Sequence, residues 1–479
     1  PLSPPTDRGT AARLAASALR RGTPGTDLTD VHRWYADFGR RAYTRVRRIA
    51  LDSLTGWRRD PATGDIGHDS GRFFTVRGLE VHMPGAAVPH WHQPILDQGE
   101  VGILGLLVKD IGGVPHLLMQ AKVEPGNCNG LQLSPTVQAT RSNYTRVHRG
   151  RAVPYLGYFR DTSRHRVLAD VRQSEQGAWF YRKRNRNMVV EVREDVEVLD
   201  GFRWMTLGQV HELLAAEDLV NMDARTVLSC LPFAGPGLHD AIPAGGDGFR
   251  AALLRSCSGA AGALHPTGDI LSWITRMRAT TDVHTRWAPL DGLPGWRRTD
   301  GGITHESGLF FDVIGVSVRA GGREVNEWTQ PMIEPRAPGV IAFLASRIGG
   351  VLHVLVHARA EPGYVDVVEL APTVQATPQT YDALPGEARP RYLDTVLGAR
   401  PEDIRFDAVL SEEGGRFYHA RNRYLVVETE PGTRAHPPDF RWMTLHQLTG
   451  LLAHSHYLNV QARSLVACLH SLTGAAPAS

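Results

Sequence analysis

Three polar side chains that could take part in catalysis alternate along one predicted strand. Gln120, Lys122 and Glu124 point one way in the run MQAKVE, and the intervening apolar side chains point the other way. The strand ends at a Pro-Gly pair, and polar groups beside such a loop are well placed to line a pocket. A solvent-exposed strand face would show the same alternation. Two features favour the pocket: the chain has only three lysines, and the glutamate recurs in a second copy of the motif.

The segment after this strand is dense in hydrogen-bonding groups. From Asn127 it reads NCNGLQLSPTVQAT, in which Thr136 and Gln138 alternate with apolar residues. These side chains could line the pocket, or they could satisfy the backbone of their own loop.

Two arginines follow directly in the string RSNYTRVHRG. Ser142 or Asn143 could cap a short helix there. A helix N-terminus with Arg141 and Arg146 beside it suits a diphosphate, because the helix dipole and the forked guanidinium groups both attract phosphate oxygens.

Other polar clusters are open to two interpretations. Arg184, in the run RKRNRN, could contact phosphate or lie in an exposed turn. His90 and His92 have the spacing of a metal-binding pair, but no clustered carboxylates follow them, so no metal site is predicted. The chain has no glycine-rich dinucleotide fingerprint, no phosphate-loop motif and no serine or cysteine nucleophile signature, so no cofactor is predicted.

The motifs EPG and PTVQAT occur twice, at an offset of 237 residues. The offset holds within two residues from Trp57 and Trp296 to Cys230 and Cys468. So long a self-match indicates a duplicated domain of about 200 residues. We predict repeat one at residues 31–231 and repeat two at residues 268–470, joined by a Gly/Ala/Pro-rich linker at 232–267. Residues 1–30 are predicted to be a flexible N-terminus and 471–479 a tail.

The composition excludes some classes of partner. A net charge of +3 over 479 residues gives no basic field for nucleic acid or for a membrane surface. No apolar run approaches the length of a membrane helix, and no signal peptide is recognised. The four cysteines lack metal-type spacing, so the expected location is a reducing cytoplasm.

Within each repeat the patterns predict mainly strands. A hairpin is expected over residues 101–124 with its turn at Gly112-Gly113, and further strands over 187–192 and 424–429. Amphipathic helices are expected over 31–54 and 269–283, and two helices close each repeat. The predicted fold class is α+β, with a mixed β-sheet flanked by helices in each of two tandem domains.

Several strings together resemble one family, the NDP-hexose 2,3-dehydratases of deoxysugar biosynthesis. They are QPILDQGEVGILG, LMQAKVEPGN, QLSPTVQATRSNYTRVHRG and RNRNMVVEV, and the resemblance covers nearly the whole chain. It implies two tandem Nudix-like domains in a homodimer. It also implies that dTDP-4-keto-6-deoxy-D-glucose loses its C2 hydroxyl after abstraction of the C3 proton, without metal or redox cofactor. The dTDP-3,4-diketo-2,6-dideoxyhexose would pass to a separate NADPH-dependent 3-ketoreductase in antibiotic biosynthesis.

This reaction gives the candidate residues roles. Glu124 is the candidate base, Lys122 would stabilise the enolate oxygen, and Tyr144 is the candidate acid, or exchanges roles with Glu124. Arg141 and Arg146 would hold the diphosphate. The aromatic residue that stacks on thymine would be Trp91 or Tyr158. The other candidates for substrate binding are His92, Gln120, Asn127, Thr136, Gln138, Ser142, Asn143 and Arg184.

Repeat two keeps only part of this set. Arg359 stands in place of Lys122, and Pro378 in place of Arg141, so the proposed phosphate clamp is lost. Repeat one is therefore expected to hold the working pocket and repeat two a degenerate one. The second-pocket candidates are Arg359, Glu361, Thr373, Gln375 and Tyr381.

Two other functions stay open. One is a sugar-nucleotide-binding module without turnover. The other is a Nudix-type sugar-nucleotide hydrolase, which would need an R-E-x-x-E-E helix to hold Mg²⁺. Neither repeat contains that string, so the octahedral oxygen site is not predicted.

Overall fold

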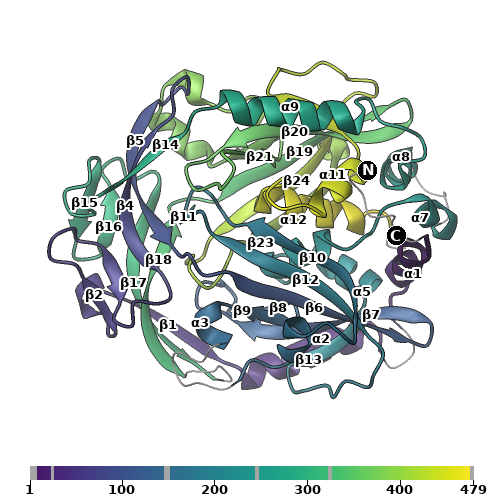
Figure 1. Cartoon of the computed structure of the whole chain (residues 1–479), viewed down its shortest axis with the longest axis horizontal. Helices are drawn as coiled ribbons and strands as arrows, with labels where there is room; N and C mark the ends of the chain where they lie inside the picture. The colour runs from purple at the N-terminus through teal and green to yellow at the C-terminus, as the bar shows by residue number, and fades with distance from the viewer. Residues whose placement is uncertain (1–7, 23–25, 145–151, 243–247, 322–325, 475–479) are drawn as a thin grey trace.

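The structure, a computed structural model, describes residues 8–22, 26–144, 152–242, 248–321 and 326–474 (Figure 1). This part of the chain contains two seven-stranded sheets, one six-stranded sheet and one five-stranded sheet, with helices packed around them. The predicted α+β class with mixed sheets flanked by helices is confirmed. Among the described helices, none is both long and apolar enough to cross a membrane.

Each repeat contributes a seven-stranded mixed sheet with the same strand order. In both sheets one central pair of strands is parallel and the other pairs are antiparallel. In repeat one the order is β10 (Arg166–Ser174), β12 (Arg184–Val192), β6 (Gly102–Ile111), β7 (Val114–Val123) and β13 (Phe202–Thr206), with β8 (Leu131–Ser134) on β7 and β9 (Val137–Ala139) on β6. In repeat two it is β23 (Ile404–Ser411), β24 (Arg421–Glu428), β19 (Gly339–Ile348), β20 (Val351–Ala360) and β25 (Phe440–Met443), with β21 (Val368–Ala371) on β20 and β22 (Val374–Ala376) on β19.

The predicted hairpin is β6 and β7, joined at Gly112-Gly113. Both glycines have positive φ, 62° and 83°, which a two-residue hairpin turn requires and which other residues adopt at a cost. Met119, Ala121 and Val123 are buried on one face of β7, as the alternation predicts. The matching turn of repeat two, Gly349-Gly350, has the same conformation.

The two smaller sheets exchange strands between the repeats. β1 (Thr44–Ile49) belongs to repeat one but pairs with β17 (Phe311–Ala320) of repeat two. Reciprocally, β14 (His284–Ala288) of repeat two pairs with β4 (Thr75–His82) of repeat one. The two sequence repeats are therefore not separable bodies. The other strands are β2 (Trp57–Arg59), β3 (Ile66–His68), β5 (His90–Asp97), β11 (Phe180–Tyr181), β15 (Trp296–Thr299), β16 (Gly302–His305) and β18 (Glu327–Pro335).

Because β1 pairs with the other repeat, one predicted helix is shorter than expected. The helix predicted over residues 31–54 is α2 (Leu28–Arg41), which ends before β1 begins. The run TRVRRI forms a strand because β17 offers it a full ladder of backbone partners, and tertiary pairing outweighs the local helical pattern. The helix expected over residues 269–283 is confirmed as α9 (Thr267–Thr280).

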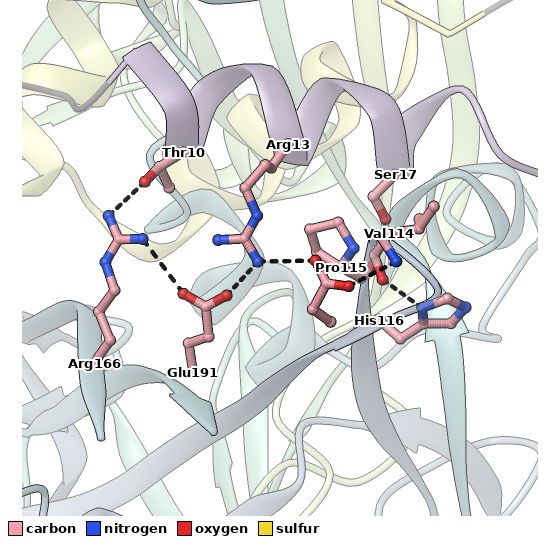
Figure 2. Close-up of polar contacts among 10 residues, drawn as sticks. Thr10, Arg13, Ser17, Val114, Pro115, His116, Arg166 and Glu191 are labelled. Carbon is pink, nitrogen blue, oxygen red and sulfur yellow. Dashed lines mark hydrogen bonds and ion pairs between the residues drawn. The ribbon is translucent and has the colours of Figure 1, made fainter. Parts of the chain in front are cut away.

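Two helices occupy stretches predicted to be flexible or linking. Residues 8–18 of the predicted flexible N-terminus form α1 (Arg8–Ala18), with Leu14 and Ala15 buried. In Figure 2, Arg13 of α1 meets Glu191 of β12, and Ser17 donates a hydrogen bond of 2.6 Å to the carbonyl of Pro115. Small residues in these stretches suggested loops, but the same small residues let the helices pack closely on the sheets.

The predicted linker contains α7 (Pro236–Ala241) and α8 (Gly248–Ser258), and α8 is the repeat-two copy of α1. Ser17 of α1 accepts a hydrogen bond from the amide of Leu207, and Ser256 of α8 accepts one from Leu445, both at 2.8 Å. The duplication thus begins upstream of the predicted boundaries.

The remaining helices close the repeats. The two predicted closing helices are α5 (Leu207–Leu213) and α6 (Met222–Ser229) in repeat one, and α11 (Leu445–Leu452) and α12 (Val460–Ser471) in repeat two. Short helices are α3 (Arg141–Tyr144), α4 (Gly157–Arg160) and α10 (Leu393–Leu397), with 3-10 turns at Leu51–Ser53, Pro378–Ala383, Gly386–Ala388 and Pro401–Asp403.

Candidate active site between the repeats

A cavity of about 290 Å³ lies where the two repeats meet. Repeat one contributes Lys122 and Glu124 from the end of β7, and repeat two contributes Glu413 and Arg416 from the loop between β23 and β24. The cavity is therefore shared, which corrects the expectation that repeat one alone would form it. The polar residues that line it are His68, Ser70, Gln98, Lys122, Glu124, Gln138, Thr140, Glu175, Lys183, Asn185, Asp223, Thr329, Gln330, Glu413 and Arg416.

The predicted residues Glu124, Lys122 and Gln138 come together as one hydrogen-bonded group. Gln138 donates from Nε2 to Oε1 of Glu124 at 2.8 Å, and Lys122 donates from Nζ to the carbonyl of Gln138 at 2.8 Å. Asn221, at the N-terminus of α6, donates to Oε1 of Gln138 at 3.0 Å and fixes the orientation of the amide. These hydrogen bonds fix one carboxylate oxygen of Glu124 and so orient its side chain. Glu124 is only 4% exposed.

Glu413 and Arg416 form a second group that sequence reasoning missed. The backbone amide of Arg416 donates to Oε2 of Glu413 at 2.7 Å, and the guanidinium lies 3.5 Å from Oε1. Burial raises the pKa of Glu413 to about 7, against the opposing effect of Arg416 and with help from the nearby Glu124 carboxylate. This carboxyl group can therefore carry a proton at neutral pH, as a general acid must.

Burial also shifts the pKa values of three further ionisable groups of the cavity. It lowers the pKa of Lys183 to about 8 and raises the pKa values of Asp223 and Glu175. Lys183 donates to the carbonyl of Glu100, and Asn185 donates to Glu175 at 2.7 Å. Several buried groups of opposite charge with displaced pKa values are the usual setting for acid–base chemistry.

Aromatic residues line part of the cavity. Trp57 packs against Phe74 with ring centroids 4.8 Å apart, and its indole donates to the carbonyl of Thr329 at 2.8 Å. Phe73, Phe180 and Trp328 also line the cavity. Flat apolar rings suit the stacking of a nucleobase or the face of a sugar ring.

A second depression of about 570 Å³ adjoins the cavity and shares Phe73 and Phe74 with it. Its lining includes Arg72, Arg141 and Arg186, so Arg141 lies beside the cavity as a phosphate-binding residue should. Arg186 also forms a bidentate pair with Asp170, at 2.7 and 2.6 Å.

Several predicted binding residues have structural partners away from the cavity. The hydroxyl of Thr136 donates to the carbonyl of Leu118 at 2.5 Å and accepts from the amide of Leu107 at 2.9 Å, so it ties the sheet together. Gln120 accepts a hydrogen bond from Ser134, and Ser142 binds Glu100 through both its amide and its hydroxyl. Residues that also lie outside the cavity lining are Trp91, His92, Asn127, Tyr158 and Arg184.

Part of the predicted clamp cannot be placed. Arg146 lies outside the described residues. Asn143 and Tyr144 belong to α3, and their side chains also lie outside the described part of the structure.

The second-pocket candidates of repeat two form a closed network. Oε1 of Glu361 accepts hydrogen bonds from Arg359 at 2.8 Å and from Gln375 at 2.9 Å. Tyr364, at the position of Asn127, is 4% exposed and accepts a hydrogen bond from Asn459 at 3.0 Å. The carboxylate that would act as base here is thus neutralised by an arginine. Thr373 repeats the structural role of Thr136, and Tyr381 packs at the edge of the repeat-two core.

Comparison of the repeats contained a signal for the missed pair. The string EQGAWF at residues 175–180 corresponds to EEGGRF at residues 412–417. Glu413 and Arg416 are therefore charged only in repeat two, where they replace Gln176 and Trp179. Repeat two otherwise lost polar residues of its own pocket. The two charged residues that it gained here therefore indicate a role outside that pocket.

Fold and site together define a duplicated α+β protein with an acid–base cavity between its repeats. The sequence model described as NDP-hexose 2,3-dehydratase matches residues 28–231 and 267–469. A dTDP-4-dehydro-6-deoxy-alpha-D-glucopyranose 2,3-dehydratase of Saccharopolyspora spinosa is 53% identical over 462 residues, covering 96% of this chain and 95% of that protein. Proteins with the same description from Amycolatopsis orientalis and Streptomyces violaceoruber are 45% and 48% identical, covering 96% and 93% of this chain and 94% and 98% of their own. The chain belongs to the NDP-hexose 2,3-dehydratase family, which confirms the resemblance.

Proposed function

We propose that this protein is a hydro-lyase that removes water across C2 and C3 of dTDP-4-keto-6-deoxy-D-glucose. The observation that carries the proposal is the cavity shared by the repeats, which Glu124, Lys122 and Glu413 line together. The near full-length similarity to relatives described as 2,3-dehydratases of this sugar nucleotide supports the same substrate.

The chemistry needs a base, a positive group at the ketone oxygen and an acid. The C4 ketone acidifies the C3 proton, and its removal places negative charge on the C4 oxygen. The C2 hydroxyl then lies β to the carbanion and leaves as water when it is protonated. The resulting enol tautomerises to the 3,4-diketo-2,6-dideoxy sugar. General acid and base groups each contribute about 10²–10⁴-fold to such a step.

We assign these roles within the cavity. Glu124 is the base, because Gln138 holds one oxygen and orients the carboxylate at the end of β7. Lys122 stabilises the enolate oxygen. Glu413 protonates the leaving hydroxyl, since its pKa of about 7 keeps a proton available at neutral pH. This assignment gives Glu413 the role first considered for Tyr144.

The remainder of the substrate would extend along the adjoining depression. Arg72 and Arg141 would bind the diphosphate, and the aromatic pair Trp57 and Phe74 would receive a flat ring. The mixed sheets flanked by helices support a Nudix-like origin of the repeats. We further propose a homodimer in the cytoplasm, whose labile product an NADPH-dependent 3-ketoreductase converts during antibiotic deoxysugar biosynthesis.

The test is a mass-spectrometric assay on dTDP-4-keto-6-deoxy-D-glucose, run in H₂O and in D₂O. A 3-ketoreductase with NADPH is added to trap the diketone. The expected result is loss of one water together with deuterium in the trapped sugar ring. Unchanged substrate despite tight binding by calorimetry would instead indicate a binding module. Release of a nucleoside monophosphate on addition of Mg²⁺ would indicate a hydrolase.

A further inference from the structure

A group of histidines gathers on the six-stranded sheet that contains β4, β5 and β14, away from the cavity. These three strands lie together at one side of the molecule (Figure 1). Glu80 stands six residues along the chain from the cavity-lining Phe74, which is about 20 Å in an extended strand. The group therefore does not belong to the site described above.

The strand register brings the side chains to one face. Glu80 of β4 lies opposite His92 of β5, and His82 lies opposite His90. Residues two apart on a strand share a face, and directly opposite residues of an antiparallel pair are near neighbours. On the other side of β4, His284 of the exchanged strand β14 lies opposite His82. Four histidines and a carboxylate thus converge from three strands.

Three of these side chains are close enough to share one ion. The ligand atoms of Glu80, His90 and His92 all lie within 4.8 Å of one another. Nε2 of His90 is 3.1 Å from Oε1 of Glu80, close to the separation of two ligands on one tetrahedral ion. The rings of His90 and His92 have centroids 5.1 Å apart. His82 flanks the group, with its ring 6.3 Å from that of His90.

We propose that Glu80, His90 and His92 bind a divalent transition-metal ion of the Zn²⁺ type. Imidazole nitrogens with one carboxylate oxygen are a ligand set that suits zinc and its neighbours in the first transition series. Water or His82 completes the coordination.

Arg286 of β14 orients the carboxylate for this role. It donates to Oε2 of Glu80 from Nε at 2.8 Å and from Nη2 at 2.6 Å, which leaves Oε1 directed toward His90. Partners of this kind commonly fix the orientation of metal ligands. Because Arg286 comes from repeat two, the ion would also strengthen the attachment of the exchanged strand to the six-stranded sheet.

The corresponding place in repeat two provides an internal comparison. The same register occurs there between β17 and β18, where Ser317 lies opposite Thr329 and Arg319 lies opposite Glu327. None of the four residues is a histidine, and one has a positive charge. The fold therefore does not demand histidines at these positions, so their gathering in repeat one is a property of that sheet alone.

The experiment is calorimetric titration of the chelator-treated, full-length protein with Zn²⁺ at pH 7.5. We expect one ion per chain, and a loss of affinity of about tenfold or more in each of Glu80→Gln, His90→Ala and His92→Ala. His32→Ala, which removes an exposed histidine of α2, serves as the matched control and should bind as the wild type does. Circular dichroism checks that each variant is folded.

Two further measurements separate a true site from weak surface binding. Co²⁺ should give a d–d absorption spectrum of a low-coordinate site in the wild type and in His32→Ala, but not in His90→Gln. Zn²⁺ should raise the melting temperature of the wild type and not that of Glu80→Gln. Zn²⁺ affinity that is equal in the wild type and in all three ligand variants would overturn the proposal, as would binding that requires His284 but not Glu80.

Discussion

Arg225 and Arg463 each donate a hydrogen bond to a backbone carbonyl of the other repeat. Nη2 of Arg225 in α6 lies 2.5 Å from the carbonyl of Ser411, and Nη2 of Arg463 in α12 lies 2.6 Å from that of Ser174. Both side chains are fully buried, with 0% exposure. Ser411 and Ser174 end the strands that lead into the two loops of the shared cavity, so this reciprocal pair holds the site together.

Replacement of either arginine should destabilise the whole chain. Arg225→Leu or Arg463→Leu leaves buried carbonyl groups without donors, and Arg463→Leu also removes the positive charge near Glu175 and Glu369. We expect a loss of about 3–5 kcal/mol in the free energy of unfolding, measured by urea denaturation. Arg33→Ala, which breaks an exposed pair with Asp30, should change it by less than about 1 kcal/mol. Equal effects in the buried and exposed variants would contradict this role.

Substitution of Glu413 should separate abstraction of the C3 proton from elimination of water. If Glu124 is the base and Glu413 the acid, Glu413→Gln still exchanges the C3 proton with solvent but eliminates water about 100-fold more slowly. Glu124→Gln should lose both steps. Deuterium at C3 of recovered substrate, measured by mass spectrometry, distinguishes the two variants. Loss of exchange in Glu413→Gln with exchange retained in Glu124→Gln would reverse the assignments.

The raised pKa of Glu413 predicts a pH dependence of activity. An acid with a pKa of about 7 is protonated below that pH, so kcat/KM should fall as pH rises through about 7. The Glu413→Gln enzyme should lack this decline. The free energy of unfolding should depend on the same group. Folded Glu413 keeps its proton between the ordinary glutamate pKa and pH 7, so the stability falls as the pH rises through that window. A wild-type profile that rises through pH 7 would show that Glu413 acts as a base.

Replacement of Arg141 in repeat one should weaken substrate binding, whereas replacement of Arg359 in repeat two should have little effect on turnover. Arg141→Ala removes one phosphate-binding group from the depression beside the cavity, and a lost charged hydrogen bond should raise KM about 10- to 100-fold with kcat nearly unchanged. Arg359→Lys places the repeat-one residue in the closed network of repeat two and should leave turnover within a few-fold. Steady-state kinetics on both variants checks this. An unchanged KM in Arg141→Ala would exclude the diphosphate from this depression.

The sequence predicts well those features that depend on neighbours in the chain. The hairpin around Gly112-Gly113 and the shared face of Lys122 and Glu124 follow from turn chemistry and alternation, and both are found in the structure. Thr136 shows the limit of this reasoning. Its hydroxyl looked available for a ligand, but it bonds to the carbonyl of Leu118, because a buried loop must satisfy its own backbone.

The missed half of the cavity depends on contacts between distant segments. Glu413 reaches Glu124 only because the loop after β23 crosses to repeat one, and no local pattern encodes that crossing. The exchange of β1 and β14 is hidden for the same reason, since each strand finds its partner in the other repeat. Only the divergence between EQGAWF and EEGGRF pointed toward such a role.

The duplicated Glu-Pro-Gly motif marks a reciprocal contact between the repeats, which gives the last prediction. The amide of Gly126 donates to the carbonyl of Gly414 at 2.7 Å, and that of Gly363 donates to Gly177 at 2.8 Å. A Cβ at Gly126 would lie 1.8 Å from the carbonyl oxygen of Phe417, which no small adjustment relieves. Gly126→Ala should therefore displace the loop that carries Glu413 and Arg416, and should lower both the melting temperature and kcat. Gly268→Ala, in α9, meets nothing within 4 Å and should leave both unchanged or raise the melting temperature slightly. Full activity in Gly126→Ala would show that the close contact does not position Glu413.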